Sequence, residues 1–211
     1  MKRSLFFLLV ILLLTGGVNA QTTLSLSGYP IVTTGWVMGG TGSAFAVDSM
    51  IELTRNSPSQ NGYIYYNSAM NVTACGQFTV DFDYKISNSG GCGNGDGIGF
   101  YFLNPMTGFT GGGGLGFPTP MTGLALTMDT WDNDGDGRNP EYELLGYTSP
   151  TVYSEGSGFR VPGTAILASQ TYMVDASWHH VRISYNAGTI RLYVNGSTSP
   201  NMTGTFPITT A

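Results

Sequence analysis

The chain has 211 residues, a formal net charge of −5 at pH 7 and no cluster of lysine or arginine. This balance excludes nucleic acids and anionic membranes as partners, because both are recognised through basic patches, and it fits a neutral or cationic ligand better. Hydrophobic residues make up 41% of the chain and charged residues only 10%, which excludes intrinsic disorder. We therefore expect the 31 glycines to form turns in a folded β protein.

Residues 1–20 have the pattern of a signal peptide. Lys2 and Arg3 precede an apolar run from Leu5 to Leu14, and the segment ends on small residues at Ala20. The run has 10 residues, whereas a membrane-spanning helix needs about 20. We therefore expect a secreted protein without membrane insertion, whose mature part, residues 21–211, forms one domain.

Export has two consequences for the chemistry of the chain. Cys75 and Cys92 are its only cysteines, and an even pair behind a signal peptide predicts one disulfide, with two buried free thiols as the alternative. Three sequons begin at Asn71, Asn195 and Asn201. They would be glycosylated in a eukaryotic host.

Alternating apolar and polar residues predict several strands. The clearest strand runs from Phe78 to Ile86, where every second residue is apolar. The same period recurs at 181–185 and 190–194, and residues 186–189 between them are typical of a hairpin turn.

Two further runs, residues 98–103 and 124–130, are more continuously apolar. Such runs, bounded by glycine and proline, are typical of strands buried on both faces. No window of eleven or more residues has a helical period, and residues 197–211 have the composition of a loop. We therefore predict an all-β fold, either a sandwich or a barrel.

Three segments carry a resemblance to a known family. They are NGDGIGF at 94–100, GGGGLGF at 111–117 and LALTMDTWDN at 124–133. In this order and spacing they resemble the L-type (legume-type) lectin family, and the similarity covers roughly residues 28–195. The resemblance implies a concanavalin-like antiparallel β-sandwich of the jelly-roll type, which binds glycans or glycoproteins.

The first two segments supply candidate sugar contacts. Asp96 stands on a turn between two glycines, so its carboxylate has room to accept hydrogen bonds from neighbouring sugar hydroxyls; the alternative is an Asp-Gly turn that bonds its own backbone. The resemblance implies that Gly113 donates a backbone N–H to the sugar and that Asn133 contacts it. Trp131 is a candidate for stacking on a sugar ring, with rim packing as the alternative.

The third segment leads into a stretch dense in oxygen ligands. Such density repels itself unless a hard cation neutralises it, and Ca²⁺ is the natural candidate. The resemblance implies that the ion is held by Asp129, the carbonyl of Trp131, Asn133 and one of Asp136 and Asn139. The whole stretch comprises Asp129, Asp132, Asn133, Asp134, Asp136, Asn139, Glu141 and Glu143.

The same stretch also matches an EF-hand calcium loop. Residues 132–137 read DNDGDG, with Glu143 at the twelfth place. An EF-hand requires a helix on each side. The preceding residues 124–130 have the pattern of a strand, and residues 144–150 have that of a strand or loop, which disfavours this alternative.

The sequence departs from the family at three places. Thr127 occupies the position of a glutamate that binds a second, transition metal in plant members, and no histidine occurs between residues 130 and 178, so we expect one Ca²⁺ site alone. Asn139-Pro140 replaces the family's Asp-Pro. The family's last strands are not apparent before Ala211, which leaves a fragment, a truncated gene product or a degenerate lectin open.

The predicted function is calcium-dependent glycan binding without catalysis. One alternative is a laminin-G or pentraxin-like adhesion module, since the sequence from Trp178 to Gly196 is also similar to those domains. The other is a glycoside hydrolase on the same sandwich, but the paired carboxylates of a retaining enzyme are missing around Asp129. His179 and His180 have no ligand partner at a suitable spacing, so we interpret them as structural.

Overall fold

The computed structural model of the chain describes residues 23–42, 44–55, 57–68, 76–87, 95–102, 108, 111–153 and 159–208. Within these ranges the chain forms strands and two 3₁₀ turns, η1 (Gly112–Gly114) and η2 (Thr171–Val174). None of the helical segments found there has the length and apolar character needed to cross a membrane. The predictions for residues 1–20, Cys75, Cys92 and Asn71 lie outside the described residues.

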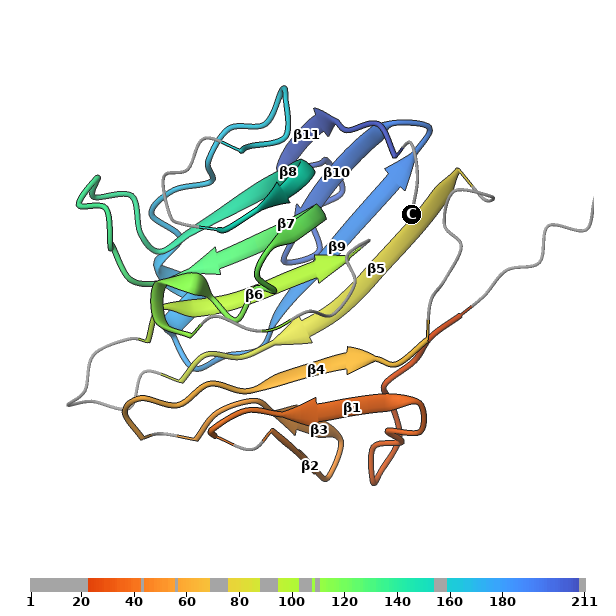
Figure 1. Cartoon of the computed structure of the whole chain (residues 1–211), viewed down its shortest axis with the longest axis vertical. Coiled ribbons are helices and arrows are strands. Elements are labelled where there is room, and N and C mark those ends of the chain that lie inside the picture. Colours follow the sequence, from red (N-terminus) through yellow and green to blue (C-terminus); the bar gives the residue numbers. More distant parts are fainter. Residues whose placement is uncertain are drawn as a thin grey trace, which may run out of the picture.

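One layer of the molecule is a four-stranded antiparallel sheet with the order β11-β10-β9-β5 (Figure 1). It contains β5 (Gln77–Tyr84), β9 (His179–Asn186), β10 (Thr189–Val194) and β11 (Met202–Thr205). Alternate residues of β9 and β10 are buried, and the two strands are joined by a two-residue hairpin. The predicted strands and hairpin of this region are therefore confirmed.

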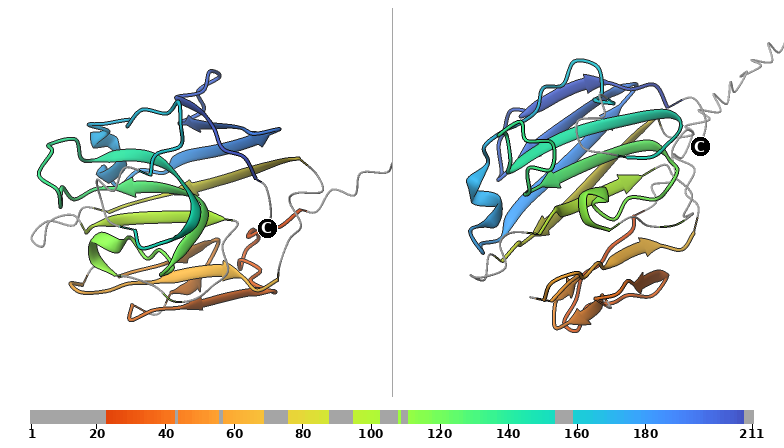
Figure 2. Two further views of the ribbon diagram at one scale, coloured as in Figure 1. Left: turned by 45° about the horizontal axis from the view of Figure 1, so that its top comes forward. Right: turned by 60° about the vertical axis from the view of Figure 1, so that its left-hand side comes forward.

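The other layer is a three-stranded antiparallel sheet with the order β6-β7-β8. Its strands are β6 (Gly97–Phe102), β7 (Met121–Asp129) and β8 (Glu141–Thr151). Figure 2 shows the two layers from two further directions. Two smaller pairs, β1 (Trp36–Gly39) with β4 (Tyr63–Tyr66) and β2 (Phe45–Val47) with β3 (Met50–Glu52), lie beside them.

The main core fills the space between the two sheets. Burial of this apolar surface is the principal stabilising contribution, at about 25 cal/mol per Å² removed from water. A second, smaller cluster covers the other face of the three-stranded sheet, so β7 is buried on both faces as predicted. The main core includes Leu124, Leu126, Met128, Tyr142 and Leu144 from one sheet, and Val181, Ile183, Ile190, Leu192 and Met202 from the other. Two sheets packed face to face confirm the predicted antiparallel β-sandwich.

Two predictions about individual segments were wrong. Residues Ile98–Phe102 of β6 are half-buried, because β6 stands at the edge of the three-stranded sheet with β7 as its strand partner. Residues 197–211 are not all loop, since β11 pairs with β10. Met202, Gly204 and Phe206 point into the core in alternation with exposed residues.

Candidate functional site

Asp96 lies in the turn that leads into β6, next to the end of β7. Gly97 is paired with Asp129 at the end of the ladder between these strands. The backbone N–H of Thr130 donates to the carbonyl of Asp96 at 2.9 Å, and the hydroxyl of Thr130 donates to the carbonyl of Gly95. The turn and the loop after β7 are therefore held against each other, which places Asp96 beside the candidate metal loop.

The glycine-rich loop packs against the same end of the sheet. A Cβ atom on Gly113 would lie 3.2 Å from Nδ2 of Asn133, and one on Gly112 would lie 3.8 Å from Oδ2 of Asp96. Gly99 admits this approach from the side of β6, because a Cβ there would come within 2.6 Å of the carbonyl oxygen of Leu115. Backbone without side chains thus borders the carboxylate and the amide.

Asn133 connects the candidate sugar residues with the metal loop. Its Nδ2 atom lies 3.4 Å from Oδ1 of Asp96 and 3.3 Å from the carbonyl oxygen of Trp131. The Trp131 side chain is 51% exposed, so its ring is open to solvent. The structure therefore places Asp96, Gly113, Asn133 and the carbonyl of Trp131 beside one another.

The predicted calcium ligands meet around the carbonyl of Trp131. Asp129 is 1% exposed, and its Oδ1 atom accepts the N–H of Trp131 at 3.2 Å. Nδ2 of Asn139 donates to the carbonyl of Trp131 at 3.2 Å. The Oδ1 atom of Asn139 is buried and has no hydrogen-bond partner within the described part of the chain. Carboxylate, carbonyl and amide oxygens are the ligands that Ca²⁺ prefers, so these residues fit the ion.

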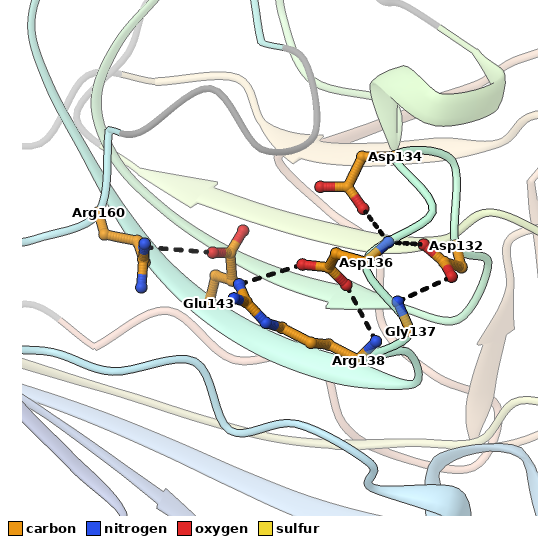
Figure 3. A network of polar contacts seen from close by, with 7 residues as sticks. All are labelled: Asp132, Asp134, Asp136, Gly137, Arg138, Glu143 and Arg160. Carbon is orange, nitrogen blue, oxygen red and sulfur yellow. Dashed lines mark hydrogen bonds and ion pairs between the residues drawn. The ribbon is translucent and has the colours of Figure 1, made fainter.

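Asp136 does not join this group. It lies in an exposed loop with Asp132 and Asp134, where one carboxylate oxygen from each residue lies within 4.8 Å of the others (Figure 3). Its backbone N–H donates to both other carboxylates, at 3.0 and 3.1 Å, and its own carboxylate pairs with the guanidinium of Arg138 at 3.0 Å. Of the two candidates for the fourth ligand, Asn139 lies beside the Trp131 carbonyl and Asp136 lies with the exposed carboxylates and Arg138.

The EF-hand alternative is wrong. The loop is flanked by β7 and β8 and not by helices. Glu143, which would be the twelfth residue of such a loop, lies within β8 and pairs with Arg160 at 3.6 Å (Figure 3). The DNDGDG sequence therefore forms a turn between two strands.

A polar contact between two distant loops borders the glycine loop and was not predicted from the sequence. The N–H of Thr41 donates to Oδ1 of Asn61 at 2.9 Å, and the N–H of Asn61 donates to the hydroxyl of Thr41 at 3.0 Å. A Cβ atom on Gly111 would lie 3.2 Å from Nδ2 of Asn61. No motif links residues 20 positions apart in two separate loops. The contact of Thr41 with Asn61 can therefore be recognised only in the folded chain.

Both histidines belong to the four-stranded sheet. His179 is buried, with its two ring nitrogens 3.2 Å from Oδ1 of Asn195 and 2.9 Å from Oδ1 of Asp175. The hydrogen bond from His179 lowers the pKa of the Asp175 carboxyl below its usual value. His180 lies between two carboxylates of β5, at 2.7 Å from Asp81 and 2.8 Å from Asp83. These contacts account for the histidines without a metal.

Comparison with solved structures identifies the same architecture. The chain superposes on the exoplasmic/lumenal domain of VIP36 in its Ca²⁺/Man₃GlcNAc-bound form with a TM-score of 0.62 and 17% sequence identity, covering 82% of this chain and 70% of that one. The metal-free form of the same domain gives a TM-score of 0.60 and 15% identity over 84% and 75%. This likeness confirms the concanavalin-like fold. No curated protein sequence matches the chain.

A family model described as the legume-like lectin family matches residues 27–204. The match includes strands β1 to β10, all of β11 except its last residue, and every residue of the candidate site. It agrees with the resemblance carried by the three sequence segments. The chain belongs to the legume-like lectin family.

Proposed function

We propose that this chain binds glycans in a calcium-dependent manner at the site formed by Asp96, Gly113, Trp131 and Asn133. The observation that carries the proposal is the position of Asn133, whose amide contacts both the Asp96 carboxylate and the Trp131 carbonyl. One side chain thus connects the candidate sugar acceptor with the candidate metal ligands. Because its family consists of lectins, the chain is a binding protein and not an enzyme, as predicted.

Each residue has a definite role in this proposal. The carboxylate of Asp96 accepts hydrogen bonds from two neighbouring sugar hydroxyls, and such charge-assisted bonds are among the strong ones. Gly113 is the second residue of the 3₁₀ turn η1, and the N–H groups at the start of such a turn have no partner within it, so that of Gly113 is available to the sugar. The exposed ring of Trp131 provides an apolar surface for one face of a sugar.

The proposed calcium ligands are Asp129, the carbonyl of Trp131, Asn133 and Asn139. When bound, the ion supplies positive charge that fixes the oxygens around it. The amide of Asn133 is then held in one orientation beside Asp96. Structures of the VIP36 domain include a Ca²⁺/Man-bound form, which makes mannose-containing glycans the first class to test.

A glycan array tests the proposal directly. Residues 21–211 are screened with Ca²⁺ and again with a chelator, beside the substitution Asp96→Ala. Asp83→Ala is the matched control, because this exposed carboxylate lies on the four-stranded sheet and contacts His180 instead. We expect binding that requires Ca²⁺, is lost in D96A and survives in D83A. A folded, calcium-loaded chain that binds no glycan would refute the proposal and favour a protein-binding sandwich.

We further propose that the chain is secreted with a Cys75–Cys92 disulfide and, in a eukaryotic host, with glycans on its sequons. Asn195 and Asn201 are exposed. The Oδ1 atom of Asn195 accepts the backbone N–H of His180 at 3.3 Å, and that of Asn201 accepts the N–H of Val194 at 2.8 Å, so that Nδ2 is the atom left for a glycan. Intact mass before and after reduction and deglycosylation of the secreted protein checks both modifications.

A further inference from the structure

The proposed calcium site is short of negative charge. Of its four ligands, the carbonyl of Trp131 and the amides of Asn133 and Asn139 are neutral, so Asp129 alone brings a formal charge. A calcium ion carries two positive charges, and the affinity of calcium sites depends on the number of charged ligands. A second carboxylate close to Asp129 would complete the balance.

Glu141 lies in the right place to provide it. It is the first residue of β8 and stands directly opposite Asp129 in the ladder between β7 and β8. Residues directly opposite each other in an antiparallel pair have Cβ atoms about 4.5–5.5 Å apart. The neighbouring pair, Met128 and Tyr142, points into the main core, so Asp129 and Glu141 point together to the other face of the sheet.

Both carboxylates are withdrawn from water. Asp129 is 1% exposed and Glu141 is 3% exposed. Like charges close together in a medium of low dielectric constant disfavour each other strongly. A divalent cation held by Asp129 would offset this repulsion, because each carboxylate would then also be attracted to a positive charge. The carbonyl of Pro140, which accepts the N–H of Gln170 at 2.7 Å, fixes the backbone just before Glu141.

We propose that Glu141 supplies the second negative charge of the calcium site and acts with Asp129 to set its affinity. This inference rests on the proposed function, since it assumes that the ion binds at Asp129. It makes Glu141 a determinant of calcium affinity that does not contact the sugar. The acidic residues of this stretch thus include a buried pair, Asp129 and Glu141, and an exposed triad, Asp132, Asp134 and Asp136.

Glu143 provides a matched control two residues further along β8. It lies on the same face of the strand as Glu141, and its side chain is also largely buried, at 8% exposed. Its carboxylate, however, lies 3.6 Å from the guanidinium of Arg160. Its charge is therefore balanced by a cation of the protein itself, and neutralising it should not affect a calcium ion at Asp129.

The experiment is a calcium titration of the full chain by calorimetry, repeated with Glu141→Gln and Glu143→Gln. Loss of a group that supports a metal site typically lowers metal affinity about 10–100-fold, and we expect this for E141Q and an unchanged affinity for E143Q. Glu141→Asp keeps the charge and should retain more affinity than E141Q. It also serves as the test variant if E141Q fails to fold, as judged by circular dichroism.

Thermal unfolding separates a structural role from this one. If Glu141 only stabilises the sheet, E141Q changes the melting temperature of the calcium-free chain and leaves the calcium affinity as it was, which overturns the inference. If the unsubstituted chain is folded but takes up no calcium, the proposed function is refuted, and the proposed role of Glu141 is refuted with it. Calcium binding in the unsubstituted chain with equal affinity in E141Q rejects the role of Glu141 alone.

Discussion

Removal of calcium should lower the thermal stability of this domain, because the ion would join the ends of two strands. Asp129 ends β7 and Asn139 lies two residues before β8, so the proposed ligands on both sides of the loop would hold the same ion. A chain that unfolds separates them and loses the site. Any ligand bound only by the folded state stabilises that state by mass action.

The size of the effect follows from the affinity expected for such a site. Calcium modules outside the cell bind with dissociation constants of about 10⁻⁴–10⁻³ M, so about 10 mM Ca²⁺ would exceed the dissociation constant by roughly 10- to 100-fold. The stabilisation, RT ln(1 + [Ca²⁺]/Kd), is then about 1.4–2.7 kcal/mol. For a domain of this size, 1 kcal/mol shifts the melting temperature by about 2–4 °C. We expect a total shift of about 3–11 °C.

Differential scanning calorimetry in Ca²⁺ and in chelator measures this shift. Asp129→Asn is the control, because it removes the only formal charge among the four proposed ligands while keeping an oxygen that can accept the N–H of Trp131. D129N should unfold at the same temperature in both solutions. Equal melting temperatures for the unsubstituted chain, with and without Ca²⁺, would show that no calcium ion links β7 and β8.

Two further substitutions test the packing around the site. Gly99→Ala would place a Cβ atom 2.6 Å from the carbonyl oxygen of Leu115, and the forced shift of the glycine loop should cost about 1–3 kcal/mol of unfolding free energy; urea unfolding measures it, and Gly95→Ala, which meets nothing within 4 Å, should be neutral. Burial raises the pKa of Tyr84, whose hydroxyl bonds that of Tyr142, from 10.0 to about 12. The unfolded chain loses this proton at a lower pH than the folded chain does. The part of the folding free energy that comes from Tyr84 is therefore fully present below pH 10 and is lost as the pH rises from 10 to 12. Tyr84→Phe should flatten that decline in urea midpoints, and an unchanged slope would contradict the assignment.

The sequence predicts the strands whose two faces differ in polarity. β9 and β10 alternate buried and partly buried residues as their pattern indicates. β11 escaped prediction because Gly204 occupies one of its inward positions. A Cβ atom there would lie 2.7 Å from Cγ1 of Val161, so close packing requires a glycine where an apolar residue would have revealed the period of two.

Part of the candidate site could likewise be predicted from the sequence, and part could not. Asp96, Gly113, Asn133 and Asn139 could be predicted, because they stand in segments whose order and spacing resemble the family. Asn61 does not, because it reaches the glycine loop through pairing of distant loops, which no local pattern encodes. The sequence likewise leaves open which of Asp136 and Asn139 lies beside the Trp131 carbonyl, since both carry oxygen at similar spacing from Asp129; in the folded loop Asn139 does.

The alternation of β7 explains how one strand serves both the core and the site. Met128 is fully buried between the sheets, and the next residue, Asp129, faces the opposite side, where its carboxylate accepts the N–H of Trp131. The strand ends there, so the chain is free to turn the Trp131 carbonyl toward Asn133 and Asn139 while its ring stays in solvent. A shift of one residue in the register of β7 would bury Asp129 in the core and turn Met128 to the site. The hydrophobic core that fixes this register therefore also fixes the position of the candidate ligands.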